Sequence, residues 1–317
     1  MARVKQKVAV LMGGRSMERS VSLSSGRRIE RALKDRGYNV FSLDVDELLV
    51  PSLLEEKPDL VYIALHGKYG EDGTIQELLE ILDIPYTGPG PLSSMIGFNK
   101  VLTKELLLVN EIPTPRFFTL SATTIQEMGA SDTLSFAWNK LEHPVVVKPA
   151  AQGSALGVKV VNTYDELPGA LITALAYDER VLIEEFVAGT EVAVSVLGED
   201  SPEPLPAVEI VPLSGYYDFE ARYTPGKAEY FVPARLDQDW LRQAEQAAVS
   251  THKLLKCKDL SRVDMIVSPD GTPFVLELNI SPGMTETSLL PLSAEGAGLS
   301  FEDLVEKLVK MALGEAC

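Results

Sequence analysis

The sequence predicts a multidomain α/β protein, and three observations support this prediction. Its 317 residues are enough for two or three units that each have a core. An apolar run at residues 7–12 leads through two glycines into a helical pattern, which is typical of the first unit of a nucleotide-binding α/β domain. Near the C-terminus, two β-rich segments flank an Asp-Gly pair and predict a hairpin.

Composition narrows the functional class. The chain is 45% hydrophobic and 24% charged, which is ordinary for a soluble globular protein. Its net charge of −17 argues against a nucleic-acid partner, because there is no basic surplus to meet phosphates. The two cysteines indicate neither a disulfide framework nor a thiolate metal site. The first apolar run is too short for a signal peptide or a membrane span, so we expect a cytoplasmic protein without a membrane partner.

The N-terminal part is predicted to contain strands at residues 7–12, 38–43 and 60–65. Ligands of such α/β sheets bind beyond the carboxyl ends of the strands, so residues 13–18 and 66–72 should lie at the functional edge. The glycine pair lacks the G-x-G-x-x-G spacing of a dinucleotide site. Taken singly, Glu18 is better explained as a solvated residue in a first helical turn, and His66 as a loop histidine.

A proline- and glycine-rich stretch at residues 85–91 indicates a domain edge. Beyond it, the pattern predicts a helix at residues 99–109 and a buried strand at 144–148 that ends in Lys148. The loop that follows reads P-A-A-Q-G-S-A-L-G-V. Its small residues would let backbone N–H groups approach phosphate oxygens closely, and Ser154 adds a hydroxyl. A plain turn between two strands is the alternative.

Two further strands are predicted at residues 181–187 and directly after them, where Glu184, Glu185 and Glu191 interrupt an apolar run. Residues 212–233 form a long irregular segment rich in tyrosine, phenylalanine and glycine. A loop of this length in a compact domain is more often functional than not. The last third of the chain is also predicted to contain amphipathic helices at residues 238–255 and 301–313.

The predicted hairpin has strands at residues 263–267 and 274–280. With the Asp-Gly pair at its centre, Asp264 lies directly opposite Glu277. Asn279 lies two residues beyond Glu277 and projects from the same face. Pro269 cannot donate a ladder hydrogen bond, so the loop could have four residues instead of two in the same symmetric register.

The facing carboxylates of the hairpin predict a bound cation. Acidic side chains opposite one another repel, and a hard cation between them removes the repulsion. Leu276 and Leu278 are predicted to point into the core, which leaves the acidic face toward a polar space. An incidental acidic pair on a solvated face is the alternative. Because Mg²⁺ usually shares its open positions with substrate phosphates, we also expect a nucleotide ligand.

Taken together, the motifs resemble those of D-alanine–D-alanine ligases of the ATP-grasp superfamily over nearly the whole chain. The matching segments are, in order, G-G-R-S-M-E-R-S-V-S-L-S-S-G, H-G-K-Y-G-E-D-G-T-I-Q, P-Y-T-G, V-V-V-K-P, Q-G-S-A-L-G-V, V-L-I-E-E-F-V-A-G-T-E, Y-D-F-E-A-R-Y-T-P-G, S-R-V-D and L-E-L-N-I-S-P-G-M-T-E-T-S. The resemblance implies an ATP-grasp fold with a Rossmann-like pre-ATP-grasp domain at residues 1–98, a central domain at 99–190 and a C-terminal domain at 191–317.

The resemblance also implies the reaction. ATP would phosphorylate the carboxylate of one D-alanine, and the amine of a second would attack the D-alanyl phosphate to give D-alanyl-D-alanine for peptidoglycan synthesis. ATP and Mg²⁺ (two ions, with Mn²⁺ as a substitute) are the implied cofactors, and the implied assembly is a homodimer. The alternatives are D-lactate or D-serine as second substrate, another ATP-grasp carboxylate–amine ligase, and a non-catalytic nucleotide-binding protein.

The resemblance assigns roles to individual positions. The implied amino-acid site contains Glu18, Ser154, Tyr223, Arg262, Ser288, Gly283 and His66. The implied ATP site contains Lys100, Lys148, Gly153, Ser154, Gly157, Glu184, Phe186, Val187, Glu191, Tyr216, Arg222, Leu276 and Asn279. The implied metal ligands are Asp264, Glu277 and Asn279.

Five of these residues would act directly on the amino acids. Glu18 would pair with the ammonium of the first D-alanine, and His66 is a candidate for receiving the amine proton. Arg262 and the backbone N–H of Gly283 would stabilise the oxyanion of the tetrahedral intermediate. Ser288 would bind the carboxylate of the second D-alanine, together with the N–H of the residue after it.

The chain departs from the family pattern at a few positions. Arg222 stands where we expect a lysine in the lid loop, and a planar guanidinium is not a compact ammonium. Gln152 replaces a glutamate in the phosphate loop, and Ala155 replaces a serine, which removes one hydroxyl donor. Tyr223 is retained, and in this family a tyrosine there accompanies D-alanine as the acceptor.

Overall fold

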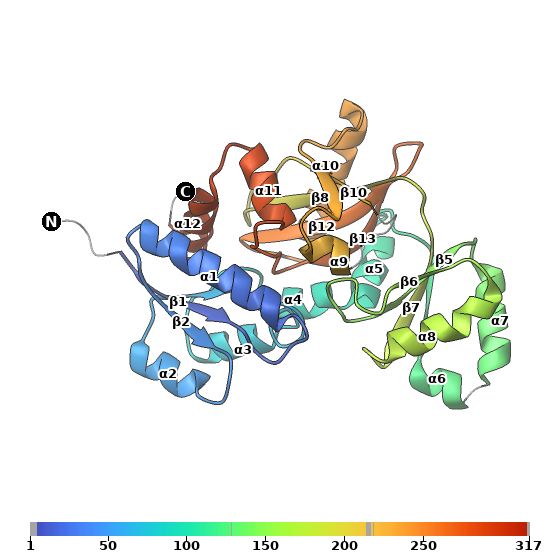
Figure 1. Cartoon of the computed structure of the whole chain (residues 1–317), viewed down its shortest axis with the longest axis horizontal. Coiled ribbons are helices and arrows are strands. Elements are labelled where there is room, and N and C mark those ends of the chain that lie inside the picture. Colours follow the sequence, from blue (N-terminus) through green and yellow to red (C-terminus); the bar gives the residue numbers. More distant parts are fainter. Residues whose placement is uncertain (1–4, 128, 214–216, 218, 316–317) are drawn as a thin grey trace.

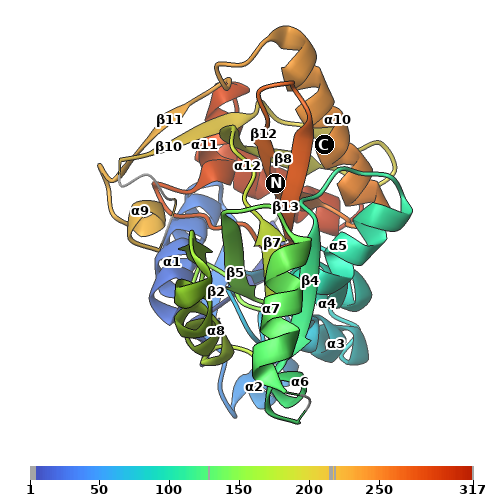
Figure 2. The same ribbon diagram turned by 90° about the vertical axis from the view of Figure 1, so that its right-hand side faces the viewer.

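The computed structural model describes residues 5–127, 129–213, 217 and 219–315. Three sheets organise this part of the chain, and each is built from one contiguous segment (Figure 1). The N-terminal segment, in blue, and the middle segment, in green, lie on opposite sides of the molecule. The C-terminal segment, in orange and red, lies above them, and Figure 2 shows its sheet over the middle one. The predicted α/β class is confirmed.

The first sheet is parallel, with strand order β2-β1-β3. The elements of this segment are β1 (Lys7–Met12), α1 (Arg19–Asp35), β2 (Asn39–Asp44), α2 (Leu49–Glu56), β3 (Leu60–Ile63), α3 (Thr74–Ile81) and α4 (Pro91–Phe98). Val8 and Val10 pack with α1 and with α12 (Phe301–Ala312), whereas Ala9 and Leu11 pack with α2 and α3. Burial on both faces explains why β1 is apolar at nearly every position.

The second sheet is antiparallel, with strand order β4-β7-β5-β6. The elements are α5 (Lys100–Val109), β4 (Phe117–Ser121), α6 (Ala122–Glu127), α7 (Ala130–Lys140), β5 (Val145–Pro149), β6 (Lys159–Val161), the 3₁₀ turn Tyr164–Glu166, α8 (Leu167–Leu175) and β7 (Arg180–Glu185). Val145 and Val147 pack under α8, so Val146 and Lys148 point to the opposite face.

The third sheet has the order β11-β10-β8-β12-β13, with β9 paired to β8. The elements are β8 (Thr190–Leu197), β9 (Glu203–Pro204), β10 (Val208–Pro212), α9 (Phe219–Tyr223), β11 (Ala228–Phe231), α10 (Gln238–Leu254), β12 (Leu260–Val267), β13 (Pro273–Asn279), α11 (Leu289–Gly296) and α12. The segment predicted as irregular therefore contains a helix and a strand, because pairing with β10 orders β11. None of the helices in the described residues is long and apolar enough to cross a membrane.

The turn of the β12–β13 hairpin differs from the predicted two- or four-residue loop. Ser268 N–H donates to the carbonyl of Thr272 at 3.0 Å, which leaves residues 269–271 as a three-residue loop. Gly271 ends this loop with a φ of 87°, the left-handed conformation that such a loop requires. An odd number of loop residues displaces the pairing next to the turn by one position.

A β-bulge in β13 restores the predicted pairing further along the hairpin. Asp264 lies opposite Glu277, as predicted, but the register shifts between this pair and the turn, so Leu276 is the extra residue of β13. The expectation that Leu276 faces the core is therefore wrong. Val275 and Leu278 are buried in the core, and Leu276 lies beside Glu277 on the opposite, polar side of the sheet.

Asp259, directly before β12, links the C-terminal segment to the N-terminal one. It is 4% exposed, and its Oδ2 accepts a hydrogen bond from Gly88 N–H at 2.8 Å. Burial raises the pKa of this carboxyl from 3.8 to about 6. The folded state therefore favours the protonated carboxyl of Asp259. The stability that this preference contributes is fully present below pH 3.8 and is lost as the pH rises through about 6.

Replacing Asp259 by asparagine should therefore stabilise the protein at neutral pH. The amide keeps an acceptor for Gly88 and suits the left-handed backbone of this residue (φ 60°), but it carries no charge to bury. We expect the free energy of unfolding to rise by about 2 kcal/mol at pH 7.5 and to change little at pH 4, measured by urea denaturation. An equal gain at both pH values would contradict an origin in ionisation.

Candidate active site

A cleft of about 770 Å³ lies between the second and third sheets. The second sheet contributes the face of β5 and β7 that α8 does not cover, and the third contributes residues of β8, β12 and β13. The volume falls within the range of cofactor pockets. The predicted ATP-site residues that line it are Lys100, Lys148, Glu184, Phe186, Val187, Glu191, Arg222 and Leu276.

Glu184 is the centre of a buried cluster of charges at the floor of the cleft. Its side chain is 2% exposed and forms ion pairs with Lys148 and Lys104, the latter at 2.9 Å. Burial alone would raise the pKa of Glu184, but the two ammonium groups hold it below its ordinary value. Burial also lowers the pKa of Lys104 to about 8. Glu184 therefore remains ionised and positions Lys148 at the cleft.

Lys104 is a site residue that the sequence analysis missed. Its Nζ also donates to Thr114 Oγ1 at 2.5 Å, and its side chain is fully buried. A lysine on an amphipathic helix is usually solvated, so the helical pattern alone does not indicate a buried role for Lys104. The available signal was its position one helical turn after Lys100, which places both ammonium groups on the same face of α5.

The predicted metal ligands lie together on the side of the hairpin that faces the cleft. Asp264 and Glu277 are cross-strand partners, and Asn279 Nδ2 donates to Asp264 Oδ2 at 3.1 Å. Arg262 donates to both oxygens of Asp264, at 2.7 and 2.8 Å, and Lys100 lies 3.0 Å from Glu277. Among the described residues, no group of three or more His, Cys, Asp or Glu side chains could hold a metal. The donor set is instead two carboxylates and one amide, whose hard oxygens fit Mg²⁺.

The outer part of the cleft is suited to a flat aromatic group. Phe186, in the connection between β7 and β8, lines the cleft and is 40% exposed, which leaves its ring free to stack on a ligand. Glu191 lies nearby in β8, where burial raises its pKa to about 7. Gly157 does not line the cleft: a β-carbon there would lie 2.7 Å from the Tyr177 side chain, so Gly157 packs closely against that ring. The predicted contact of Tyr216 lies outside the described residues.

A smaller pocket of about 50 Å³ adjoins the cleft, and Tyr217 and Arg222 line both. Arg222 Nη2 lies 3.9 Å from Glu277, and the guanidinium stacks on Tyr217. The predicted residues that line the smaller pocket are Glu18, His66, Gly153, Ser154, Tyr223, Arg262, Asn279, Gly283 and Ser288. These come from all three segments of the chain, so the pocket exists only in the assembled fold.

Three segments meet in a hydrogen-bonded chain within the smaller pocket. Glu18 stands at the start of α1, Ser154 in the loop after β5, and Tyr223 at the end of α9. Ser154 Oγ donates to Glu18 and lies 2.6 Å from the hydroxyl of Tyr223. Burial and the nearby carboxylate of Glu71 raise the pKa of Glu18. A buried carboxylate of this kind favours a cationic ligand.

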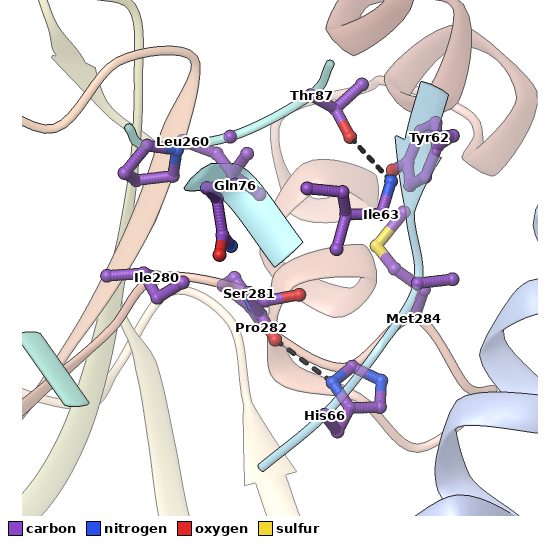
Figure 3. A pocket seen from close by; sticks show the side chains of 13 residues that line it. Tyr62, Ile63, His66, Gln76, Thr87, Leu260, Ile280, Ser281, Pro282 and Met284 are labelled. Atoms are coloured by element: carbon purple, nitrogen blue, oxygen red, sulfur yellow. Dashed lines mark hydrogen bonds between the residues drawn. The ribbon is translucent and has the colours of Figure 1, made fainter. Parts of the chain in front are cut away.

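His66 joins the N-terminal sheet to the segment after β13. Its Nδ1 lies 3.2 Å from the carbonyl of Ser281, as Figure 3 shows, and its Nε2 lies 3.1 Å from Ser25 Oγ. The cavity drawn there is only about 20 Å³, which is room for about one water molecule. Since both ring nitrogens contact protein groups, His66 helps to hold the wall of the smaller pocket; its role as proton acceptor stays a prediction.

Family models and known relatives match most of the chain. A family model described as D-ala D-ala ligase C-terminus matches residues 106–310, and one described as D-ala D-ala ligase N-terminus matches residues 49–89. The D-alanine–D-alanine ligase of Desulforamulus reducens is 44% identical over 308 residues, which cover 97% of this chain and 98% of the relative.

Solved structures show the same likeness. The D-alanine–D-alanine ligase of Bacillus anthracis complexed with ATP superposes with a TM-score of 0.82 at 33% identity, over 98% of each chain. The VanG D-Ala:D-Ser ligase of Enterococcus faecalis also has a TM-score of 0.82, at 29% identity over 97% of this chain and 99% of that one. The chain therefore belongs to the D-alanine–D-alanine ligase family.

Proposed function

We propose that the protein joins two D-alanine molecules in an ATP-dependent reaction that releases ADP and phosphate and supplies a peptidoglycan precursor. One observation carries this proposal: the cleft with lysines and facing carboxylates opens beside a pocket that contains the Glu18–Ser154–Tyr223 chain. A phosphate donor and an amino acid can therefore meet at Arg222, which lines both spaces.

The cleft would bind ATP with its phosphates toward the hairpin. Lys100 and Lys148 would contact the phosphate oxygens, and Phe186 would stack on the base. Asp264 and Glu277, with the amide of Asn279, would hold Mg²⁺, and such an ion neutralises phosphate charge. The ATP complex of the Bacillus anthracis relative supports the choice of nucleotide.

The smaller pocket would bind the amino acids. Glu18 would hold the ammonium of the first D-alanine, whose carboxylate accepts the terminal phosphoryl group of ATP. The amine of the second D-alanine would then attack this acyl phosphate, and phosphate would leave as the peptide bond forms. Arg262 and the N–H of Gly283 would stabilise the oxyanion formed in that attack, while Ser288 would hold the carboxylate of the second D-alanine.

The first test measures phosphate release with ATP, Mg²⁺ and D-alanine, and repeats it with L-alanine, D-serine and D-lactate. We expect release that depends on D-alanine and a dipeptide product identified by mass spectrometry. L-Alanine should give no product. Phosphate release that is independent of D-alanine would defeat the proposed function.

D-Serine or D-lactate as second substrate is the alternative, and the likeness to a D-Ala:D-Ser ligase is the observation that favours it. Tyr223, which is hydrogen-bonded to Ser154 in the pocket, argues for D-alanine as the second substrate. In competition between D-alanine and either alternative from pH 6 to 9, we expect the D-alanyl-D-alanine product to dominate at neutral pH. Preferential formation of the D-lactate or D-serine product there would reverse the assignment.

The domain limits and the assembly are also proposals. We propose domains at residues 1–98, 99–190 and 191–317, which follow the three sheets except that Thr190, the first residue of β8, falls in the middle domain. We further propose a cytoplasmic homodimer. Consecutive helices α3, α4 and α5 expose apolar side chains that a second copy could cover, namely Ile81, Leu92, Met95, Leu102, Leu108 and Val109. Sedimentation equilibrium would test the dimer.

A further inference from the structure

The segment at residues 281–288 belongs to the C-terminal part of the chain, but the N-terminal part holds it in place. Ser281 Oγ donates to the carbonyl of Leu65 at 3.1 Å, and Met284 N–H donates to Ser25 Oγ at 3.2 Å. This segment forms one wall of the smaller pocket. It includes Ser288, which is proposed to bind the carboxylate of the second D-alanine, the acceptor. Its position therefore depends on groups that do not line the pocket themselves.

Arg28, in α1, makes the shortest of these contacts. Its Nη1 donates to the carbonyl of Thr285 at 2.8 Å and to that of Met284 at 3.1 Å. The guanidinium stacks on Phe301, with Cζ 3.7 Å from the ring centroid. The stacking and the two hydrogen bonds together fix the side chain, which is half-buried and lies outside the pocket lining.

Thr285 connects Arg28 directly to Ser288. The carbonyl that accepts from Arg28 also accepts from Ser288 N–H at 3.2 Å, and Thr285 N–H donates to Ser288 Oγ at 2.9 Å. A displacement of Thr285 would therefore move Ser288, the residue proposed to bind the carboxylate of the second D-alanine.

We propose that Arg28 is a positioning residue for the second-substrate site, where it holds the Met284–Thr285 carbonyls so that Ser288 faces the pocket. This proposal rests on the proposed function. It extends that function by assigning control of the acceptor site to a side chain of another segment, one that never touches substrate.

The effect should be specific to the second substrate. The proposed site of the first D-alanine is built around Glu18, which accepts a hydrogen bond from Ser154. Ser154 lies in a loop that Arg28 does not contact. The hydrogen bonds of Arg28 that the structure describes go only to Met284 and Thr285, in the segment that includes Ser288. Loss of Arg28 should therefore leave binding of ATP and of the first amino acid nearly unchanged.

The experiment compares Arg28→Ala with Arg27→Ala, which removes the same charge from an exposed position of the same helix. Initial rates over a wide range of D-alanine concentrations give separate KM values for the first and second molecules. We expect Arg28→Ala to raise the second KM roughly tenfold, since two charge-assisted hydrogen bonds are lost, and to leave the first KM unchanged. Arg27→Ala should alter neither.

Hydroxylamine separates positioning from general damage to the fold. It attacks the acyl carbon of the D-alanyl phosphate, expels phosphate and gives a hydroxamate, without using the carboxylate site of the acceptor. Arg28→Ala should form hydroxamate at the rate of the unmodified protein, and Arg28→Lys, which keeps a charged donor group, should recover part of the dipeptide activity.

Two results would overturn the proposal: an unchanged second KM, or equal losses of dipeptide and hydroxamate formation. If the unmodified protein releases no phosphate with D-alanine, the proposed function itself has failed, and the positioning role fails with it. An active unmodified protein with an unaffected Arg28→Ala variant would refute the positioning role alone.

Discussion

Replacing Glu277 by glutamine should lower kcat/KM for dipeptide formation by about a hundredfold or more, because several kcal/mol of charge stabilisation depend on this carboxylate. Glu277 lies opposite Asp264 and 3.0 Å from Lys100, so it is placed to hold both a cation and a phosphate-binding lysine. We also expect the Mg²⁺ concentration for half-maximal rate to rise about tenfold or more, since a neutral amide is the weaker ligand. Steady-state kinetics over a Mg²⁺ titration measure both effects.

A matched variant controls for loss of negative charge from the same sheet. Glu229 is exposed in β11, and Glu229→Gln should leave both the rate and the Mg²⁺ dependence unchanged. Melting temperatures of the two variants would show whether either change disturbs the fold. A Glu277→Gln variant that loses activity but keeps the Mg²⁺ dependence of the unmodified protein would argue against metal binding by Glu277.

Replacing Lys104 by methionine should destabilise the protein by about 3 kcal/mol, the cost of breaking a buried ion pair. The substitution keeps much of the side-chain volume but removes the ammonium group 2.9 Å from Glu184. Glu184 then remains buried with Lys148 as its partner in the cluster. We expect Glu184 to attract Lys148 more strongly, which leaves Lys148 less available to phosphate and raises the KM for ATP. Urea denaturation and ATP kinetics measure the two outcomes.

The double variant Lys104→Met/Glu184→Gln tests the origin of that loss. If Lys104→Met destabilises the protein because the buried charge of Glu184 is no longer fully neutralised, removing that charge should recover part of the stability. The double variant should then unfold at a higher urea concentration than Lys104→Met alone. A double variant that is less stable by the sum of the two single losses would show that packing around Lys104, and not its charge, is what matters.

Helix α5 shows where sequence patterns succeed and where they fail. The predicted helix at residues 99–109 is present, and Asn99 caps its first turn by accepting from Val101 and Leu102 N–H. The buried face of the helix consists of Lys100, Thr103, Lys104 and Leu107. The exposed apolar side chains are Leu102, Leu108 and Val109. The buried face of α5 is thus largely polar, because part of this helix packs against a charged site, and hydrophobic periodicity alone does not identify such a face.

In the β12–β13 hairpin, the sequence predicts the strand register correctly but not the turn. Turn chemistry and strand alternation predict that Asp264 faces Glu277, and the structure confirms this pair. The three-residue loop and the bulge at Leu276 shift the register in opposite directions, so the predicted pair is correct although the predicted loop is not. No local pattern in the sequence distinguishes a bulged strand from a regular one at Leu276.

The sequence by itself determined the order of most strands and helices, the facing acidic pair of the hairpin and, through its motifs, the family. These features depend on neighbours in the chain: alternation within a strand, periodicity within a helix and the backbone needs of a turn. Only the tertiary structure decided that Lys104 is buried beside Glu184 and that Arg28 holds Thr285. Those contacts join segments that are far apart in the sequence, and their energies depend on burial and charge compensation that appear only when the three sheets assemble.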